Sequence, residues 1–212
     1  MRRFVITLAA ALAMAPTLRA GTPGFMHMER SEADSADLDR ISRAFNAIHT
    51  LRGAFVQIGP DGQDDEGVFY IEKPGRMRFE YHAPNPVLIV SDGSTVAVEN
   101  RKLGTLDHYP IWSTPLDLIL ADDVNLNRNP AVVGVSREPG ELIVSARESS
   151  TKVSGNLTLV FSDPGLELRQ WTIVDAQGLS TTVSLRDVKP GVSIDPGLFA
   201  LPSENKPSDK GD

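Results

Sequence analysis

The sequence predicts a mostly-β protein, built from a meandering antiparallel sheet that forms a sandwich or a barrel. Two observations predict this class. Short stretches that alternate apolar and polar residues follow one another along the chain, separated by turn sequences such as KPG, SDG, REPG and SDPG. Only one long stretch has the apolar spacing of an amphipathic helix. Evenly spaced short strands of this kind are typical of antiparallel sandwiches and barrels.

Residues 1–20 have the pattern of a secretory signal peptide. Arg2 and Arg3 precede the apolar run VITLAAALAMA, which is too short to serve as a permanent membrane anchor. We expect cleavage after Ala20. The mature chain is then a soluble protein outside the cytoplasm.

Composition divides the remaining chain into three parts. Residues 21–34 are polar and short of core formers, which is typical of a loose arm. Residues 35–202 carry the helix and strand patterns and are expected to form one domain, large enough to bury a core. Residues 203–212 are polar and are expected to be disordered.

One long helix is predicted in SADLDRISRAFNAIHTLRG, which begins at Ser35. Ser35 or Asp37 is suited to cap its start, and Gly53 follows its end. The apolar residues of this stretch recur three or four positions apart and so share one helix face. They are Leu38, Ile41, Phe45 and Ile48.

Eleven strands are predicted after this helix. Their ranges are 54–59, 67–73, 76–82, 87–91, 95–100, 103–109, 131–136, 141–147, 156–162, 166–175 and 179–188. Residues 110–130 interrupt the series with TPLDLILADD, in which Pro115 stands at the first helical position and an apolar run follows. A short apolar helix between strands must cover an apolar surface.

The alternation of apolar and polar residues within the strands indicates that this apolar surface is one face of the sheet. In RMRFEY, Met77, Phe79 and Tyr81 share one face, while the charged residues share the other. One sheet face is therefore apolar, and a long and a short helix are available to cover it. Two interpretations stay open: the helices fill an ordinary core, which is the commoner outcome, or they lie over a curved sheet and leave a hydrophobic hollow.

Charge and cysteine content exclude several classes of function. The net charge of −7 becomes −10 without residues 1–20, because that segment carries three arginines and no acid. This acidity argues against nucleic-acid binding and against attraction to anionic lipid. The absence of cysteine excludes disulfides, thiolate metal sites, a cysteine nucleophile and a lipid anchor on an N-terminal cysteine.

No residue pattern predicts catalysis or a metal site. Asp64, Asp65 and Glu66 cluster in what is expected to be a hairpin loop, where acids are commonly turn formers. Asp92, in SDG, is suited to a tight turn. The four histidines are scattered, without the spacing of a metal motif. We therefore predict a protein that is not an enzyme and has neither cofactor nor metal.

Several motifs follow one another in a specific order. They are GAFVQ, EGVFYIEKPGRMRFEY, PNPVLIVSDGSTVAVEN, a proline-led apolar segment and a closing IDPGLFALP. In this order the chain resembles the LolA family, the periplasmic carriers of outer-membrane lipoproteins. The resemblance runs from about Asp37 to Pro202.

The resemblance implies an open, incomplete antiparallel β-barrel with an N-terminal amphipathic helix and short lid helices over a hydrophobic cavity. That cavity takes the acyl chains of lipoproteins, which a LolCDE-type transporter of the inner membrane supplies and a LolB-type outer-membrane receptor accepts. The chain is then a periplasmic monomer that neither binds nucleic acid nor inserts stably into membranes. A periplasmic lipid or lipoprotein sensor on the same half-barrel scaffold is the alternative.

The resemblance and the strand alternation together suggest site residues. Lys73 stands where the family often has an arginine that hydrogen-bonds the lid backbone, and it is the candidate for the lid latch, with Arg76 or Arg78 as substitutes. Lysine keeps the charge but lacks the planar fork of arginine. The lid candidates are Trp112, Leu116, Ile119 and Leu120. The cavity candidates are Phe55, Phe69, Met77, Phe79, Tyr81, Leu88 and Val90.

Overall fold

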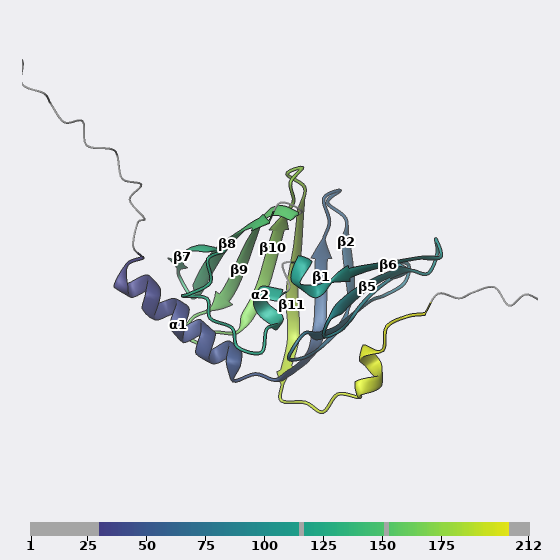
Figure 1. Cartoon of the computed structure of the whole chain (residues 1–212), viewed down its shortest axis with the longest axis horizontal. Helices are drawn as coiled ribbons and strands as arrows, with labels where there is room; N and C mark the ends of the chain where they lie inside the picture. Colours follow the sequence, from purple (N-terminus) through teal and green to yellow (C-terminus); the bar gives the residue numbers. More distant parts are fainter. Residues whose placement is uncertain (1–29, 115–116, 151–152, 204–212) are drawn as a thin grey trace, which may run out of the picture.

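Eleven antiparallel strands form one continuous sheet with two free edges in the computed structural model, which describes residues 30–114, 117–150 and 153–203. The strand order is β6-β5-β4-β3-β2-β1-β11-β10-β9-β8-β7. Sequence neighbours pair as hairpins, and β1 joins the two halves by pairing with both β2 and β11. Because β6 and β7 do not pair with each other, the barrel is incomplete, which confirms the predicted fold class (Figure 1).

The strand boundaries agree with the predicted ones to within four residues. The strands are β1 (Thr50–Ile58), β2 (Asp64–Glu72), β3 (Arg76–Tyr81), β4 (Val87–Asp92), β5 (Thr95–Asn100), β6 (Thr105–Pro110), β7 (Val132–Glu138), β8 (Glu141–Ser150), β9 (Val153–Ser162), β10 (Leu168–Val174) and β11 (Ser180–Pro190). The acidic cluster that was expected in a hairpin loop lies instead at the start of β2, because the β1–β2 ladder continues up to a tight turn.

Helix α1 (Glu32–Asn46) begins earlier and ends earlier than predicted. Its cap is Ser31, whose Oγ accepts the Asp34 N–H at 3.1 Å, so neither Ser35 nor Asp37 caps it. Gly53 lies within β1. The last residues of the expected loose arm are therefore helical, while residues 1–29 lie outside the described part of the chain.

The N-terminal half of α1 is fixed to the β7 side of the sheet by charged contacts. Arg137 of β7 pairs with Asp34 at 2.9 Å and with Asp37 at 2.7 Å. The Arg30 guanidinium donates to the backbone carbonyls of Asn127 and Val132. Figure 1 shows α1 running beside the β7–β9 half of the sheet.

We call the sheet face that packs against α1 the inner face, and the opposite one the outer face. Directly paired residues of an antiparallel ladder share a face. The inner face carries the main hydrophobic core, which includes Leu38, Ile41 and Phe45 of α1 together with apolar residues from β1, β2, β3 and β8–β11.

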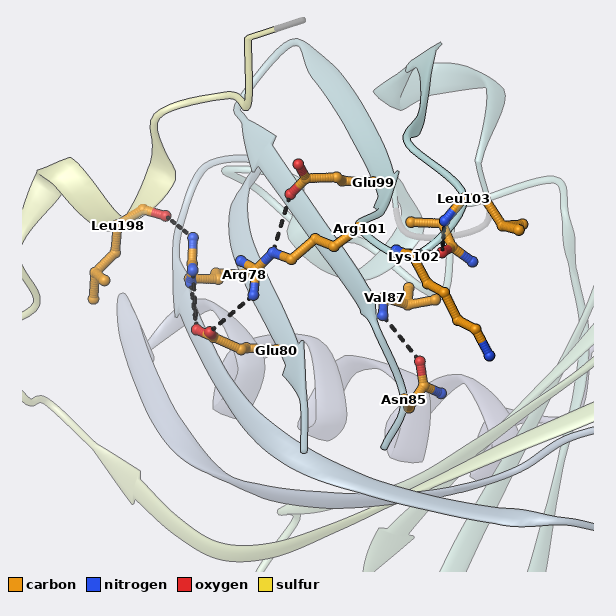
Figure 2. Close-up of polar contacts among 10 residues, drawn as sticks. Arg78, Glu80, Asn85, Val87, Glu99, Arg101, Lys102, Leu103 and Leu198 are labelled. Atoms are coloured by element: carbon orange, nitrogen blue, oxygen red, sulfur yellow. Dashed lines mark hydrogen bonds and ion pairs between the residues drawn. The ribbon is translucent and has the colours of Figure 1, made fainter. Parts of the chain in front are cut away.

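The outer face carries a smaller apolar cluster that the C-terminal segment covers. Phe199, 3% exposed, lies in the 3-10 helix η2 (Pro196–Phe199), which packs against β3 and β4. Arg78 of β3 donates from Nη1 to the Leu198 carbonyl at 3.3 Å, and pairs with Glu80 at 2.9 Å (Figure 2). Both faces of β3 and β4 are thus covered, each by a different segment.

Candidate functional site

An aromatic floor occupies the middle of the inner face. Phe79 of β3 stacks on Phe69 of β2 at 5.6 Å between ring centroids, and meets Phe55 of β1 edge to face at 5.1 Å. Trp171 of β10 lies edge to face with Phe79 at 5.9 Å, and Tyr81 lies edge to face with Phe55 at 5.0 Å. The rings therefore form a continuous row across the joined halves of the sheet.

Two glycines make room for this row. A Cβ on Gly67 would lie 2.2 Å from the Glu80 carbonyl oxygen and 2.6 Å from the Phe55 ring. A Cβ on Gly53 would lie 2.7 Å from the Arg186 carbonyl oxygen and 2.8 Å from the Phe69 ring. Each phenylalanine thus lies over a glycine of the neighbouring strand, and any other residue there would push a ring off the floor.

A small space lies beside this floor, between the helices and the sheet, and of the floor rings Trp171 lines it. It encloses about 20 Å³, little more than one water needs, which is about 10–15 Å³. Its lining is apolar except for one lysine, and comes from α1, the sheet and the short helix α2 (Asp117–Leu120). The lining residues are Phe45, Ile48, Leu51, Ile71, Lys73, Ile119, Leu120, Leu168, Trp171 and Leu185. The hollow is closed in this conformation.

Helix α2 covers the middle of the sheet (Figure 1). Ile119 and Leu120 are buried against the inner-face core, and the Leu120 carbonyl accepts the Gly75 N–H at 2.9 Å. Trp112, in the preceding 3-10 helix η1 (Ile111–Ser113), is 69% exposed and points away from the core. Leu116 lies outside the described residues. The short helix is therefore held to the β2–β3 turn by its last carbonyl.

Lys73 reaches the end of α1 rather than the lid helix. Its Nζ donates to the Phe45 carbonyl at 3.2 Å and to Asn46 Oδ1 at 3.4 Å, and lies 5.5 Å from the centre of the Phe45 ring. Burial lowers the pKa of Lys73, while the charges of Asp122 and Asp123 oppose that shift. A cation at the last carbonyls of a helix is favourable, because those groups lack partners within the helix.

Asn46 continues this contact to the segment that follows the lid. Its Oδ1 accepts the Val124 N–H at 2.9 Å, and its Nδ2 donates to the Val124 carbonyl at 3.0 Å and to Asp123 at 2.9 Å. The β2–β3 turn is thus a junction: Lys73 holds α1 and Asn46, while Gly75 holds α2. Of the two suggested substitutes, Arg76 pairs with Glu72 at 3.4 Å and Arg78 lies on the outer face.

Two of the predicted cavity residues lie on the outer face, which corrects the prediction. The β3–β4 ladder pairs Glu80 with Leu88 and Arg78 with Val90, so Leu88 and Val90 share the face of these charged residues. They are buried on the face of β3 and β4 against which η2 packs. The other five candidates, Phe55, Phe69, Met77, Phe79 and Tyr81, belong to the inner face and pack in or against its core.

A polar group stands at the end of the floor farthest from Lys73. The Tyr81 hydroxyl donates to Gln57 Oε1 at 2.7 Å, and Gln57 pairs directly with Asp65 across the β1–β2 ladder. Burial, with a smaller contribution from Asp65, raises the pKa of Tyr81 to about 12. We call Gln57, Asp65 and Tyr81 the polar rim. It has neither a nucleophile paired with a base nor a metal-binding geometry.

The remaining acidic candidate serves turn formation. Asp92 Oδ1 accepts the N–H groups of Ser94 and Thr95 at 2.8 and 2.9 Å. Burial acts to raise the pKa of Asp92, but these hydrogen bonds outweigh it and the pKa is lowered. Among the described residues, no three histidine, aspartate or glutamate side chains gather as metal ligands would. Within the same part of the chain, no helix has the length and apolarity to cross a membrane.

Sequence reasoning missed several residues of this site. Trp171 and Leu185 line the space because β10 and β11 join the first half of the sheet through β1, a long-range pairing that no local pattern reveals. Gln57 was visible only as part of the motif GAFVQ. Gly53 of β1 and Gly67 of β2 could have indicated the positions of the rings, since a glycine inside a strand indicates close approach of another group.

Comparison with known proteins gives a consistent picture. A family model described as outer membrane lipoprotein carrier protein LolA matches residues 46–202. An outer-membrane lipoprotein carrier protein from Alkalilimnicola ehrlichii is 30% identical over 185 residues, covering 79% of this chain and 78% of that protein. One from Azotobacter vinelandii is 26% identical over 211 residues, 94% of each chain. A solved LolA superfamily protein from Nitrosomonas europaea has 10% identity and a TM-score of 0.42, over 77% of this chain and 97% of that chain.

Proposed function

The chain belongs to the LolA family of outer-membrane lipoprotein carrier proteins, and on this premise we propose that it is a periplasmic carrier that holds the acyl chains of lipoproteins against its inner face. The observation that carries the proposal is an aromatic, apolar floor closed by a four-residue helix. The matched family and the relatives are named as carriers, and neither name describes an enzyme.

The energetics of acyl transfer explain what such a floor must supply. Burying one methylene is worth about 0.8 kcal/mol, so a chain of ~15 methylenes leaves a membrane only at a cost of about 12 kcal/mol. A carrier has to offer comparable apolar contact in water. Phe55, Phe69, Met77, Phe79 and Tyr81 are the residues we propose for that contact.

Loading requires the lid to move, because the closed space of about 20 Å³ is far too small for an acyl chain. We propose that α2 swings away from the floor, with Ile119 and Leu120 leaving the core and acyl methylenes taking their place. Trp112 moves with this segment and gains the apolar contact that it lacks in the closed form, where it is exposed. Exchange of one apolar surface for another keeps the net cost of opening low.

Lys73 is our proposed latch, acting through α1 and Asn46. Its hydrogen bonds fix Asn46, and Asn46 in turn holds the Val124 backbone just after α2. Gly75 completes the closed junction through the Leu120 carbonyl. Since each such hydrogen bond contributes only about 1 kcal/mol net, the junction is strong enough to favour closure and weak enough to open.

We also propose how the chain is exported and how it receives and delivers its lipoproteins. Residues 1–20 act as the signal peptide, and the carrier domain begins before residue 35, because α1 starts at Glu32 and Asp34 pairs with Arg137. A LolCDE-type transporter supplies the lipoprotein and a LolB-type receptor accepts it, with the carrier acting as a monomer. No feature of the described residues favours the sensor alternative over this role.

The proposal is tested on the tagged protein purified from its native envelope. We expect mass spectrometry to find acylated lipoproteins bound to the wild type, and depletion of the protein to leave lipoproteins in the inner membrane. Ile119→Glu places a charge in the closed space and should abolish loading. Val133→Glu makes a comparable change at a position that is 57% exposed and should load normally. Wild-type protein free of acylated material, with normal lipoprotein sorting on depletion, would contradict the proposal.

A further inference from the structure

The polar rim is unusual because it lies at the end of an otherwise apolar floor. Gln57, Asp65 and Tyr81 follow directly on the aromatic row, with Phe55 in edge contact with Tyr81. A polar group beside an apolar surface is costly unless its hydrogen bonds are made. Any polar atom of the rim that has no partner within the protein is therefore a candidate to bind a ligand.

The Tyr81–Gln57 contact leaves one kind of donor unused. The Tyr81 hydroxyl donates its hydrogen to Gln57 Oε1 at 2.7 Å. Because Oε1 faces the phenol, the amide nitrogen Nε2 of Gln57 points away from it. No described residue accepts from Nε2. Every described side-chain nitrogen or oxygen that is fully buried has a hydrogen-bond partner, so Nε2 lies at an accessible surface. Its two amide hydrogens are therefore accessible to solvent or to a ligand beside Tyr81.

The distance from the closed space to the rim suits a long acyl chain. Leu51 lines the closed space and Gln57 lies six residues farther along β1, which corresponds to ~20 Å of extended strand. On β3, Met77 lies level with Leu51 and Tyr81 lies level with Phe55, so Met77, Phe79 and Tyr81 connect the two ends. A hydrocarbon lying along this row with its tail near Lys73 brings its first carbon to the rim.

We propose that Gln57, oriented by Tyr81, donates a hydrogen bond to the carbonyl oxygen of a bound acyl group, and that Asp65 disfavours ligands with an anionic headgroup. The inference rests on the proposed carrier function and adds the recognition of the acyl linkage to it. Every acyl chain ends in a carbonyl, which needs a donor once it leaves water. A phosphate in the same place would meet the Asp65 carboxylate, which opposes it electrostatically.

The test compares uncharged ligands of equal chain length that differ in the carbonyl. Displacement of a fluorescent fatty-acid probe is measured with 1-decanoylglycerol, an ester, and with 1-O-decylglycerol, the matching ether. Wild-type protein should bind the ester about fivefold more tightly, the equivalent of one net hydrogen bond. Gln57→Leu should bind both compounds equally. Tyr81→Phe should retain part of the preference, because the amide keeps its donors but loses its orientation.

Two further variants separate recognition from structural effects. Gln63→Leu makes the same change at an exposed turn position and should keep the ester preference. Asp65→Asn should raise the affinity for decanoylglycerol phosphate about threefold relative to 1-decanoylglycerol. Circular dichroism and urea unfolding check that Gln57→Leu is folded.

The outcomes distinguish this inference from the carrier function itself. Equal affinity of the wild type for ester and ether overturns the role of Gln57 while leaving the carrier function intact. An ester preference that survives in Gln57→Leu overturns it as well. Failure of both compounds to displace the probe overturns the carrier function, and this inference with it.

Discussion

The inner and outer faces of the same strands are both covered, but in different ways. On the outer face, one buried aromatic residue, Phe199, anchors the cover, and Arg78 secures the neighbouring carbonyl of Leu198. On the inner face, the cover consists of two separate helices whose ends meet at the β2–β3 turn through backbone and amide hydrogen bonds at Lys73 and Gly75.

This difference indicates which cover is built to open. Both covers bury apolar side chains, since Ile119 and Leu120 of α2 lie in the inner core, but the polar contacts at the β2–β3 turn are hydrogen bonds that contribute only about 1 kcal/mol net each. A helix of four residues is also too short to be stable by itself, so α2 depends on its contacts. The outer cover therefore maintains the sheet, and the inner cover is the one that can exchange with a ligand.

The strongest test of the comparison is one matched substitution on each face. Phe79→Ala removes the ring that touches Phe55, Phe69 and Trp171, and should lower the free energy of unfolding by 3–5 kcal/mol, about the usual cost for a buried phenylalanine. Phe199→Ala should cost a similar amount, about 3 kcal/mol, because that ring is buried as well. Urea denaturation measures both values.

Ligand binding then separates the two faces. Phe79→Ala should change the affinity for a fluorescent fatty-acid probe, because it reshapes the floor. Phe199→Ala should leave that affinity at the wild-type value under conditions in which both variants are folded. Equal effects of the two variants on probe binding would show that the faces do not have separate roles.

A smaller loss of stability is expected from adding a side chain at Gly67, under the Phe55 ring. Gly67→Ala forces the Phe55 ring and the Glu80 carbonyl apart, and should cost about 2–3 kcal/mol by overpacking. Gly134→Ala in β7 is the matched control, because its Cβ would meet nothing within 4 Å. Thermal or urea unfolding measures the difference, and a Gly67→Ala protein as stable as wild type would mean that the ring row adapts freely.

The two faces also show what sequence could and could not predict. Alternation placed Met77, Phe79 and Tyr81 together, because β3 has one charged face and one apolar face. It failed for β4, in which Leu88, Ile89 and Val90 are all apolar, so that either face was compatible with the core. The register with β3, which pairs Ile89 with Phe79, places Ile89 on the inner face and Leu88 and Val90 on the outer face.

Long-range contacts account for the rest of what sequence missed. The pattern predicted the eleven strands closely, since turn signals and alternation are local. The partners of Lys73 depend on where α1 ends, and α1 ends at Asn46 with Ala47 as its cap, well before Gly53. Its start was misplaced because Ser31 precedes the apolar pattern that was used to find it.

Alkaline pH should weaken the inner face through Tyr81. Its pKa is raised from 10.0 to about 12, so the folded state holds the phenol proton more tightly than the unfolded state. The resulting stabilisation is complete below pH 10 and is lost as pH rises through 12. At pH 11 the loss is about 1.4 kcal/mol. Tyr81→Phe should lack this loss in urea unfolding at pH 9 to 11, whereas Tyr109→Phe, at a position 47% exposed, should show it.

The smallest expected effect concerns the junction that closes the inner face. Lys73→Leu removes two hydrogen bonds to the end of α1 and frees Asn46 from one of its contacts. Because the lysine is only partly buried, we expect a change of about 1 kcal/mol, seen as an approximately fivefold faster release of a bound fatty-acid probe in stopped-flow measurements.

Further variants test whether the faster release is specific to the Lys73 latch. Lys73→Arg keeps a cationic donor and should release the probe at nearly the wild-type rate, while Lys102→Leu removes an exposed lysine from the β5–β6 turn and should have no effect. Asn46→Ala should reproduce the faster release, and the double variant with Lys73→Leu should be little faster than either single one, since both act on one chain of contacts. Release rates that multiply in the double variant would show that Lys73 and Asn46 act separately, and that closure depends on Gly75 and the apolar lid instead.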